Sequence, residues 1–338
     1  MRRILITGGA GYIGSHTAKQ LARAGHRVTT LDNLSTGFAG AVLQGPLIRG
    51  DAGDPRLLAR VLDEHRIDTI MHFAALTVVP DSLRHPLRYY DNNTSQARTL
   101  IDAALRHGVK HLVLSSTAAV YGVPPDGRCS EDTPTAPASP YGHSKLMAEQ
   151  MLKDACAASG LRYGILRYFN VGGCDPDGDI GQSTRNASLL IKAACEAALG
   201  MRDAVSLFGT DYPTPDGTGV RDYLHVCDLA DAHRLLLDHL AGGGRSLTLN
   251  CGYGVGYSVQ EVLQAVQRAV DRPLPVRIAP RRAGDPPSVV ADASRLRALG
   301  WTPRFATLDT IVQSTLAWTR RQRDGEVRDG RARQRRTG

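Results

Sequence analysis

A tyrosine and a lysine four residues apart, Tyr141 and Lys145, have the types and spacing in this 338-residue chain that most clearly predict chemistry. On a helix, residues at this spacing project to the same side. A free tyrosine has a pKa of about 10, too high for a base at neutral pH. A neighbouring ammonium favours the phenolate and should lower that pKa toward neutrality. The pair therefore predicts a tyrosinate base, and the hydroxyl of Thr117, which follows a predicted strand, could share a hydrogen bond with the substrate oxygen.

Tyrosine–lysine pairs at this spacing also occur by chance on helix surfaces. A second motif in the chain therefore decides whether this pair indicates an active site. The segment GGAGYIG contains Gly8, Gly11 and Gly14 and lies between a predicted strand and a predicted helix. Gly8 permits a tight turn, Gly11 lets the backbone approach a diphosphate, and Gly14 allows close packing of the helix on the strand. The free N–H groups at the helix start then favour phosphate binding. This order of elements predicts a dinucleotide site.

An acidic residue after the second strand is the expected companion of that motif. Asp32 stands there, directly after the run VTTL. Its carboxylate would accept hydrogen bonds from ribose hydroxyls and repel a 2′-phosphate, and no arginine follows it directly. We therefore expect NAD rather than NADP. The positive nicotinamide ring would favour a tyrosinate at Tyr141 as well.

Short apolar runs alternate with helical patterns through the first half of the chain. The predicted strands are residues 3–7, 27–31, 69–73, 111–115 and 162–166, and the predicted helices are residues 12–24, 55–64, 86–106 and 141–158. Apolar strands that alternate with helices indicate a parallel sheet covered on both faces. The fold class is therefore α/β, with a doubly wound parallel Rossmann-type sheet and a smaller C-terminal α/β domain.

The second half is richer in Gly, Pro and Asp loops, with predicted helices at 189–198, 226–239 and 258–270. We place the NAD-binding domain at residues 1–170 and a substrate domain at 171–319, some segments of which could return to the first domain. Residues 320–338 form a basic tail that we expect to be disordered. This tail carries eight arginines against three acidic residues, so it explains most of the net charge of +8.

Because the net charge of residues 1–319 is small, we expect no nucleic-acid partner. The alternative is that the basic tail binds an anionic partner, and deleting the tail would test it. The six cysteines show no C-x-x-C spacing, which favours a reducing compartment over a zinc site or disulfide framework, and we expect no metal. No run approaches the length of a transmembrane helix. We therefore expect a cytoplasmic protein.

Five segments together resemble the extended short-chain dehydrogenase/reductase family and, within it, the UDP-glucose 4-epimerases. They are GGAGYIGSHT, SSTAAVYG, YGHSK, LRYFN and GTGVRDYLHVCDLAD. The resemblance extends to about Trp318, and the last two segments are the most specific to the sugar-nucleotide epimerase branch. The resemblance implies that Tyr141 takes the proton of a sugar 4-hydroxyl while C4 is oxidised. The 4-keto sugar then rotates and is reduced on its other face, with tightly held NAD regenerated.

The resemblance also implies a set of contact residues and an assembly. Catalysis would involve Tyr141, Lys145 and Thr117. Cofactor contacts would be Gly8, Gly11, Tyr12, Ile13, Gly14, Asp32, Asn33, Asp51, Ala52, Phe73, Ala74, Asn92, Ser115, Tyr141, Lys145 and Tyr168. Contacts to the UDP-sugar would be Thr117, Tyr141, Asn170, Leu190, Phe208, Arg221, Arg282, Asp285 and Val289. A homodimer through the helices at 86–106 and 141–158 is also implied.

One departure from the family pattern bears on the substrate. Val289 stands where a tyrosine in some members crowds the C2 substituent of the sugar, so the smaller side chain leaves room for an N-acetyl group. We therefore hypothesise that UDP-GlcNAc and UDP-GalNAc are substrates alongside UDP-glucose and UDP-galactose.

The same fold and cofactor also serve other functions. A 4-epimerase of a UDP-uronate or UDP-pentose remains open. A nucleotide-sugar 4,6-dehydratase would need an acidic pair directly after Thr117, where this chain has Ala118 and Ala119. An NAD-sensing regulator without turnover is disfavoured by the presence of Thr117, Tyr141 and Lys145.

Overall fold

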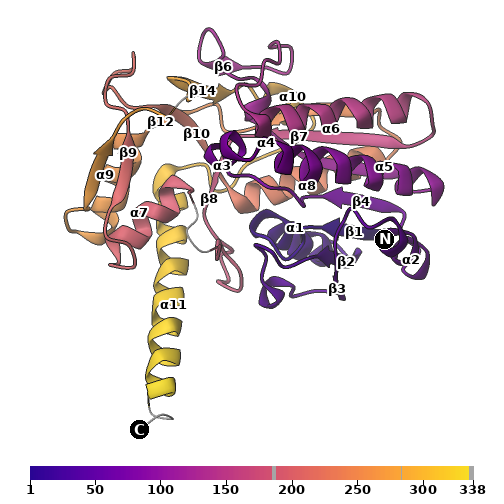
Figure 1. Cartoon of the computed structure of the whole chain (residues 1–338), viewed down its shortest axis with the longest axis horizontal. Helices are drawn as coiled ribbons and strands as arrows, with labels where there is room; N and C mark the ends of the chain where they lie inside the picture. The colour runs from indigo at the N-terminus through magenta and orange to yellow at the C-terminus, as the bar shows by residue number, and fades with distance from the viewer. Residues whose placement is uncertain (185–187, 283, 335–338) are drawn as a thin grey trace.

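The computed structural model describes residues 1–184, 188–282 and 284–334 (Figure 1). The first half of the chain and strand β11 form a seven-stranded, all-parallel sheet. The strand order is β11–β7–β5–β4–β1–β2–β3. Their bounds are β1 Arg3–Thr7, β2 Arg27–Asp32, β3 Leu47–Arg49, β4 Thr69–His72, β5 His111–Thr117, β7 Arg162–Tyr168 and β11 Leu247–Cys251. The predicted doubly wound α/β fold is confirmed.

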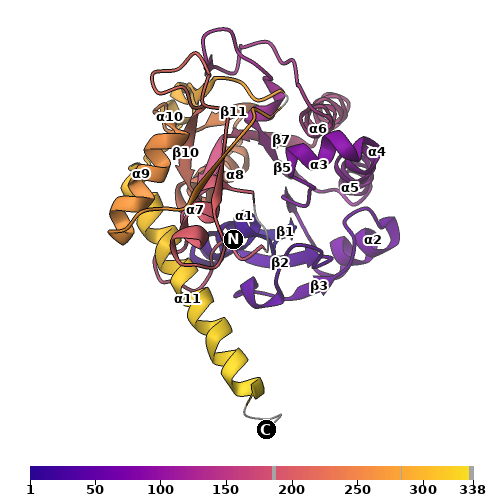
Figure 2. The same ribbon diagram turned by 60° about the vertical axis from the view of Figure 1, so that its left-hand side comes forward.

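Helices cover both faces of this sheet (Figure 2). On one face lie α1 Tyr12–Arg23 and α8 Val226–Ala241, and on the other lie α2 Pro55–Glu64, α5 Gln96–Arg106 and α6 Pro140–Ala157. Successive side chains of a strand point to opposite faces, and in β1 Ile4 and Ile6 enter the first core while Leu5 enters the second. Burial on both sides explains why these strands are continuous apolar runs.

The helix predicted at 86–106 is interrupted. It consists of α4 Pro86–Tyr89, a π-helical turn η2 Tyr90–Ser95 and then α5. Inside the π turn the buried Asn93 accepts from Leu76 N at 2.8 Å and donates to Leu76 O at 2.9 Å and Ser144 Oγ at 3.1 Å. The wide turn thus joins the loop after β4 to α6, a long-range contact that helical periodicity does not reveal. A short helix that was not predicted, α3 Val79–Arg84, precedes it.

The second half builds a smaller layer. Its strands are β8 Asn170–Gly172, β9 Val205–Phe208, β10 Val220–His225, β12 Gly256–Ser258, β13 Val276–Ala279 and β14 Ser288–Ala291. Its helices are α7 Leu190–Ala198, α9 Val259–Val270, α10 Ser294–Ala298 and α11 Leu308–Gln334. The chain crosses between the layers, because β6 Arg128–Cys129 pairs with β14 while β11 and α8 join the first sheet. The boundary at residue 170 stays a prediction.

The end of the chain differs from expectation. We predicted disorder from residue 320, but α11 continues as helix to Gln334. Residues 335–338 of the predicted tail lie outside the described residues. None of the described helices is long and apolar enough to cross a lipid bilayer.

Two aspartates of the segment RDYLHVCDLAD, Asp222 and Asp228, have buried carboxylates with a structural role. Asp222 accepts from the backbone N–H groups of Tyr253, Gly254 and Ala291. Asp228 accepts from the Tyr253 hydroxyl at 2.5 Å and from two backbone N–H groups of residues 304 and 305. Each carboxylate satisfies several buried donors that would otherwise be costly to desolvate. Both aspartates therefore hold β10 and α8 to later segments of the chain.

Three aspartates, Asp175, Asp177 and Asp179, lie close enough together to suggest a cation site. The ammonium of Lys19 from α1 already sits among them, 2.6, 2.9 and 2.8 Å from their oxygens. Lys19 is only 6% exposed, so its charge needs such partners. The cluster therefore ties the loop after β8 to α1.

Four buried histidines should make the protein sensitive to acid. Burial lowers the pKa of His16 and His233 to about 4, and that of His72 and His225 to about 3. In the unfolded chain these groups protonate below a pKa of about 6.5, so the unfolded state binds more protons between pH 6.5 and 4. Stability should be full above pH 6.5 and fall by up to about 1.4 kcal/mol per histidine per pH unit below it.

Urea unfolding followed by circular dichroism at a series of pH values would measure this loss. His233→Gln should reduce the change in the free energy of unfolding with pH by the contribution of one histidine. Substituting the exposed His143 should leave this pH dependence unchanged. A stability that stays constant between pH 6.5 and 4 would contradict the expectation.

Candidate active site

The glycine turn after β1 leaves no room for side chains. Gly8 has a φ of 72°, a region that favours glycine, and a Cβ there would lie 2.6 Å from Ala74 N. A Cβ on Gly14 would lie 2.3 Å from Gly8 O. Gly11 is the N-cap of α1 and offers no side-chain cap, so the N–H groups at the helix start face outward from the turn. This cradle fits a diphosphate and hence the predicted NAD.

Asp32 ends β2 beside that turn. Its two carboxylate oxygens accept from Ala10 N at 2.9 Å and from Leu34 N at 2.8 Å, which fixes the carboxylate and leaves lone pairs for ribose hydroxyls. Asn33 donates to Asp51, and the other Asp51 oxygen accepts from Gly53 N at 2.7 Å. The structure therefore brings together the residues predicted for the adenosine half.

Other predicted cofactor contacts line the same edge of the sheet. Phe73 and Ala74 follow β4, with the Phe73 ring 4.8 Å from that of His233, and Ala52 follows β3. The hydroxyl of Ser115 on β5 donates to Tyr168 Oη on β7 at 2.8 Å. Parallel strands end at one edge of a sheet, so Gly8, Asp32, Ser115 and Tyr168 meet there although they are distant in sequence.

Two predicted cofactor residues make contacts of a different kind within the protein. The Tyr12 hydroxyl donates to Gly173 O at 2.5 Å and so joins α1 to the segment after β8. Ile13, another predicted cofactor contact, is the next residue of α1. Asn92 donates to its neighbour Asn93. Asn93 has a structural role, because it bonds to the backbone of Leu76 and to Ser144 Oγ, and nothing local in the sequence distinguishes it from Asn92.

Tyr141 and Lys145 lie on α6, whose first turn is capped by Ser139. Tyr141 is 7% and Lys145 4% exposed, and the Thr117 side chain at the end of β5 is near enough to Tyr141 to lower its pKa. β5 is two residues longer than predicted, so Thr117 is its last residue rather than part of the following loop. The three residues predicted for catalysis are therefore assembled where β5 meets α6.

The electrostatics correct one expectation. We expected Lys145 to lower the pKa of Tyr141, but burial raises the pKa of Tyr141 and the Thr117 side chain opposes that rise only in part. Burial also lowers the pKa of Lys145 to about 8, against the attraction of Glu149. Low-dielectric surroundings disfavour both charged forms. The nicotinamide ring of bound NAD would supply the positive charge that favours a tyrosinate here.

The substrate-side residues lie in the second layer. The Arg282 guanidinium lies 3.8 Å from the centre of the Phe208 ring at the end of β9. Arg221 on β10 is paired in register with Val289 on β14. Neither arginine has a carboxylate within ion-pair distance among the residues that the structure describes. Two such guanidinium groups are suited to clamping a diphosphate.

The remaining predicted substrate contacts occupy nearby elements. Asn170 is exposed at the start of β8, and Leu190 is the first residue of α7. Asp285 follows Arg282 in the segment before β14 and donates its N–H to Arg282 O. The buried Val289 packs in a small cluster with Phe169 and residues of β6 and η3 Ala118–Val120.

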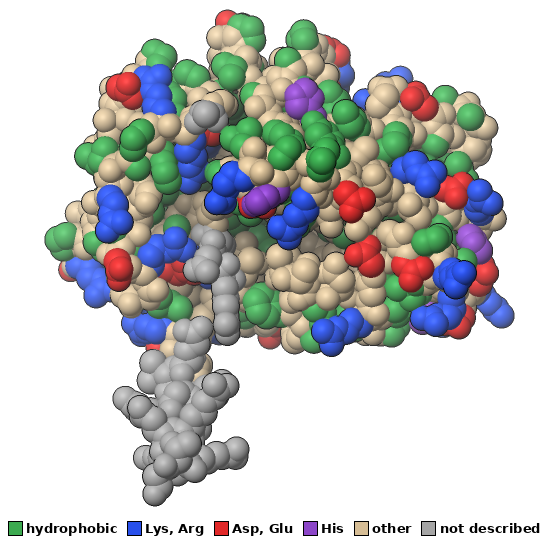
Figure 3. Space-filling model, viewed as in Figure 1, with side chains coloured by type: hydrophobic (Ala, Val, Ile, Leu, Met, Phe, Trp, Pro, Cys, Tyr) green, Lys and Arg blue, Asp and Glu red, His purple; other side chains and the backbone are tan. Residues whose placement is uncertain are grey.

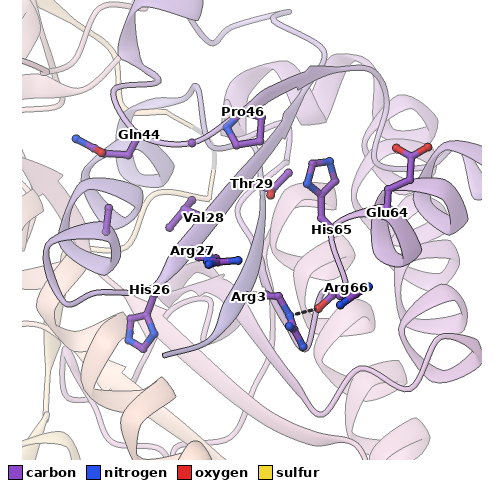
Figure 4. A pocket seen from close by; sticks show the side chains of 12 residues that line it. Arg3, His26, Arg27, Val28, Thr29, Gln44, Pro46, Glu64, His65 and Arg66 are labelled. Atoms are coloured by element: carbon purple, nitrogen blue, oxygen red, sulfur yellow. Dashed lines mark hydrogen bonds between the residues drawn. The ribbon is translucent and has the colours of Figure 1, made fainter.

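A separate cleft lies at the opposite edge of the sheet (Figure 4). It is lined by Arg3 and Arg27 at the amino ends of β1 and β2, and by residues 64–66 at the end of α2 and just after it. Arg3 Nε donates to Arg66 O across it at 2.6 Å. The dinucleotide cradle and Tyr141 are at the carboxyl ends of the strands, where α/β sheets bind ligands, so this cleft is not the candidate active site.

The sequence of residues 4–252 matches the NAD dependent epimerase/dehydratase family. The chain belongs to this family. Its relatives include the UDP-glucose 4-epimerase of Azospirillum brasilense, which is 55% identical over 320 residues, with 94% of this chain and 92% of the relative covered. Membership agrees with the glycine cradle and with the assembled Thr117, Tyr141 and Lys145.

Solved structures of family members have the same fold. The UDP-glucose 4-epimerase of Brucella ovis in complex with NAD has a TM-score of 0.91 and 42% identity, with 94% of this chain and 98% of that one covered. The UDP-Glc/GlcNAc 4-epimerase of Campylobacter jejuni has a TM-score of 0.83 and 42% identity, with coverage of 95% and 100%. The likeness therefore extends through both layers of the epimerase/dehydratase fold.

Proposed function

We propose that this protein is an NAD-dependent epimerase acting at C4 of a UDP-hexose, with UDP-glucose and UDP-galactose as the principal pair. The observation that carries the proposal is the buried Tyr141, near the Thr117 side chain and one helical turn from Lys145, at the edge of the sheet that holds the glycine cradle. Bound NAD would take up and return the hydrogen of C4.

The protein's own groups would supply acid–base chemistry and position. Tyr141 would take the proton of the 4-hydroxyl and return it to the other epimer, with the Thr117 hydroxyl bridging the phenol and the sugar oxygen. Lys145 as an ammonium would stabilise the phenolate. Burial of all three residues excludes water from the reacting oxygen.

The second layer would hold the nucleotide and leave the sugar free to turn. Arg221 and Arg282 would bind the diphosphate through forked N–H donors, and Phe208 keeps Arg282 in place by stacking. If the protein binds the substrate mainly through its diphosphate, a keto sugar can rotate about its bond to the diphosphate and present its other face to the cofactor. The remaining predicted contacts, Asn170, Leu190 and Asp285, would complete this site.

Val289 extends the proposal to acetylated sugars. It is 8% exposed and small, next to Arg221 in the β10–β14 pair. Val289→Tyr should lower kcat/KM for UDP-GalNAc by about tenfold or more while UDP-galactose turnover changes little, because the larger ring would fill the space of the acetyl group. Val289→Ala is the matched control and should keep both activities. Equal loss for both sugars in Val289→Tyr would contradict this expectation.

A 4,6-dehydratase lacks support in the site. That chemistry needs an acid and a base after Thr117, and Ala118 and Ala119 stand there, in η3. A 4-epimerase of UDP-uronates or UDP-pentoses is the second candidate, because it would use the same Tyr141, Lys145 and NAD. Comparing kcat/KM for UDP-galactose, UDP-galacturonate and UDP-arabinose decides between these two; a hexose preference supports the proposal.

We further propose a cytoplasmic homodimer formed through α4–α5 and α6. Hydrophobic side chains gather over the part of the face in Figure 3 where Figure 1 places α3, α4 and α6. Leu87 on α4 is 79% exposed and Met147 on α6 is 46% exposed, which is unusual for large apolar residues unless they are covered. All six cysteines are free, as suits a reducing compartment. Sedimentation velocity would test the dimer.

A further inference from the structure

An ion cluster fastens residues 173–181, here called the β8 loop, to α1. The ammonium of Lys19 on α1 donates to all three aspartates of this loop, and Arg23, one turn further along α1, donates to Asp177 at 2.5 Å. The side chains of Lys19 and Asp175 are buried, whereas the other two carboxylates are half exposed. None of these groups is among the residues predicted to contact NAD or the UDP-sugar.

We propose that Lys19 is a positioning residue for the epimerase reaction: it holds the β8 loop along α1 and so places the predicted UDP-sugar contacts on either side of the loop, Asn170 and Leu190, relative to bound NAD. The inference rests on the proposed function for the identity of the substrate. The effect of Lys19 on nucleotide binding can be tested without turnover.

The β8 loop contacts α1 at two levels. Tyr12 follows Gly11 of the glycine cradle, and its hydroxyl donates to Gly173 O at 2.5 Å. Lys19 lies seven residues later, about 10 Å along the helix axis, and binds the turn of the loop. Two attachment points this far apart fix the direction of the loop as well as its distance from α1. The loop is therefore placed relative to the same helix that would hold the diphosphate of NAD.

The turn of the β8 loop brings its carboxylates together. Asp175 accepts through its carboxylate from Asp179 N at 3.2 Å and through its backbone oxygen from Gly178 N at 2.9 Å. One oxygen of each of the three aspartates lies within 4.8 Å of the others. Carboxylates this close repel one another unless a cation lies between them. Removal of the Lys19 ammonium would therefore push the turn away from α1 as well as break its bonds.

On its other side the β8 loop contacts α11. The Gly173 N–H donates to Thr315 Oγ1 at 2.9 Å, and Arg321 donates to Gly178 O at 2.5 Å. Both contacts involve the backbone of the loop and leave its carboxylates to α1. The loop thus lies between the last helix of the second layer and the helix that begins at the glycine cradle, and Lys19 joins it to the latter.

Fastening alone does not explain a lysine that is only 6% exposed. Desolvating charges costs several kcal/mol, and apolar side chains often hold such a contact as well or better. An ammonium has three donors, and pairing each with a different carboxylate specifies one arrangement of the turn. Transfer of hydrogen between C4 of a sugar and NAD needs this precision, because a displacement of about 1 Å can cost about 10²-fold in rate.

The first experiment compares Lys19→Met with Lys110→Met. Methionine removes the ammonium and keeps an unbranched chain, and Lys110 is an exposed lysine before β5, which makes it a matched control. In Lys19→Met, the Kd for UDP from titration calorimetry should rise about tenfold, and kcat/KM for UDP-galactose should fall about 10- to 100-fold. The NAD content should stay full, because the glycine cradle is unchanged. Lys110→Met should match the wild type in all three.

Two outcomes of this comparison would overturn the proposal. Wild-type UDP binding and kcat/KM in Lys19→Met, with only Tm lowered, would show that Lys19 fastens the loop and nothing more. Loss of NAD together with UDP would show that the cluster supports the cofactor-binding helix rather than the placement of the substrate layer.

A second variant keeps the test decisive if Lys19→Met does not fold. The Asp177 carboxylate is half exposed, so Asp177→Lys spares the core and sets a cation against Lys19 and Arg23. UDP binding should weaken by at least about twofold, the effect of a partly exposed ion pair. Unchanged UDP binding would overturn the proposal.

The same binding data separate this inference from the proposed function. A wild type that binds UDP but converts no UDP-sugar would refute the proposed function. The placement of the nucleotide by Lys19 would still stand if Lys19→Met then bound UDP more weakly with its NAD retained, and would fall if UDP binding were unchanged.

Discussion

Replacing Tyr141 with phenylalanine should lower kcat for epimerisation by about 10²- to 10⁴-fold, the range typical of a positioned acid–base group. The substitution removes one oxygen, and among the described residues only the Thr117 side chain is given as a polar neighbour of that oxygen. The fold, Tm and bound NAD should therefore change little. The rate would be measured with UDP-galactose by proton NMR.

Tyr163→Phe is the matched control, because Tyr163 lies on β7 near the amino end of the strand, away from the active site. It should retain wild-type activity. A Tyr141→Phe enzyme within tenfold of the wild-type rate would mean that another group moves the proton. A lost rate accompanied by lost NAD would mean that the Tyr141 hydroxyl acts through its predicted cofactor contact rather than by moving the proton.

Gly14→Ala should strip the protein of its cofactor. The added Cβ would approach Gly8 O to 2.3 Å and Gly9 Cα to 2.9 Å, so the turn that cradles the diphosphate has to move. Overpacking of this kind costs about 1–3 kcal/mol, which would weaken NAD retention by about 5- to 150-fold if the strain falls on the bound state. The NAD released on denaturing the purified protein would be quantified by chromatography.

Gly160→Ala provides the comparison, since nothing lies within 4 Å of a Cβ at that position and its φ is not positive. It should keep the full complement of NAD. Stoichiometric NAD in Gly14→Ala, with an unchanged Tm, would show that the cofactor is not held by this turn.

Local sequence signals predicted much of the site. The strands show apolar runs because both faces of the sheet are covered, and Gly14 is required by the backbone of Gly8 and Gly9 a few residues earlier. The spacing of Tyr141 and Lys145 depends only on helical geometry. Each of these features leaves a pattern within a single segment of the sequence, although the contact that requires Gly8 comes from Ala74, after β4.

Features with distant causes were not predictable in this way. Asn93 is held by Leu76 and Ser144, and Glu149 by Arg167, across gaps in sequence that no periodicity spans. The π turn in the predicted 86–106 helix and the pairing of β6 with β14 have the same origin. The tyrosine pKa was predicted from two positive charges, the Lys145 ammonium and the nicotinamide ring, without burial, which raises the pKa of Tyr141 in the protein without cofactor.

Incubation of the purified protein with UDP-galactose and no added NAD, followed by proton NMR of the anomeric signals, would show whether the protein epimerises C4 with a cofactor that it retains. We expect conversion to an equilibrium mixture with UDP-glucose, since the cofactor would be retained and regenerated in each turnover. No conversion of UDP-galactose, even after NAD is added, would contradict this expectation.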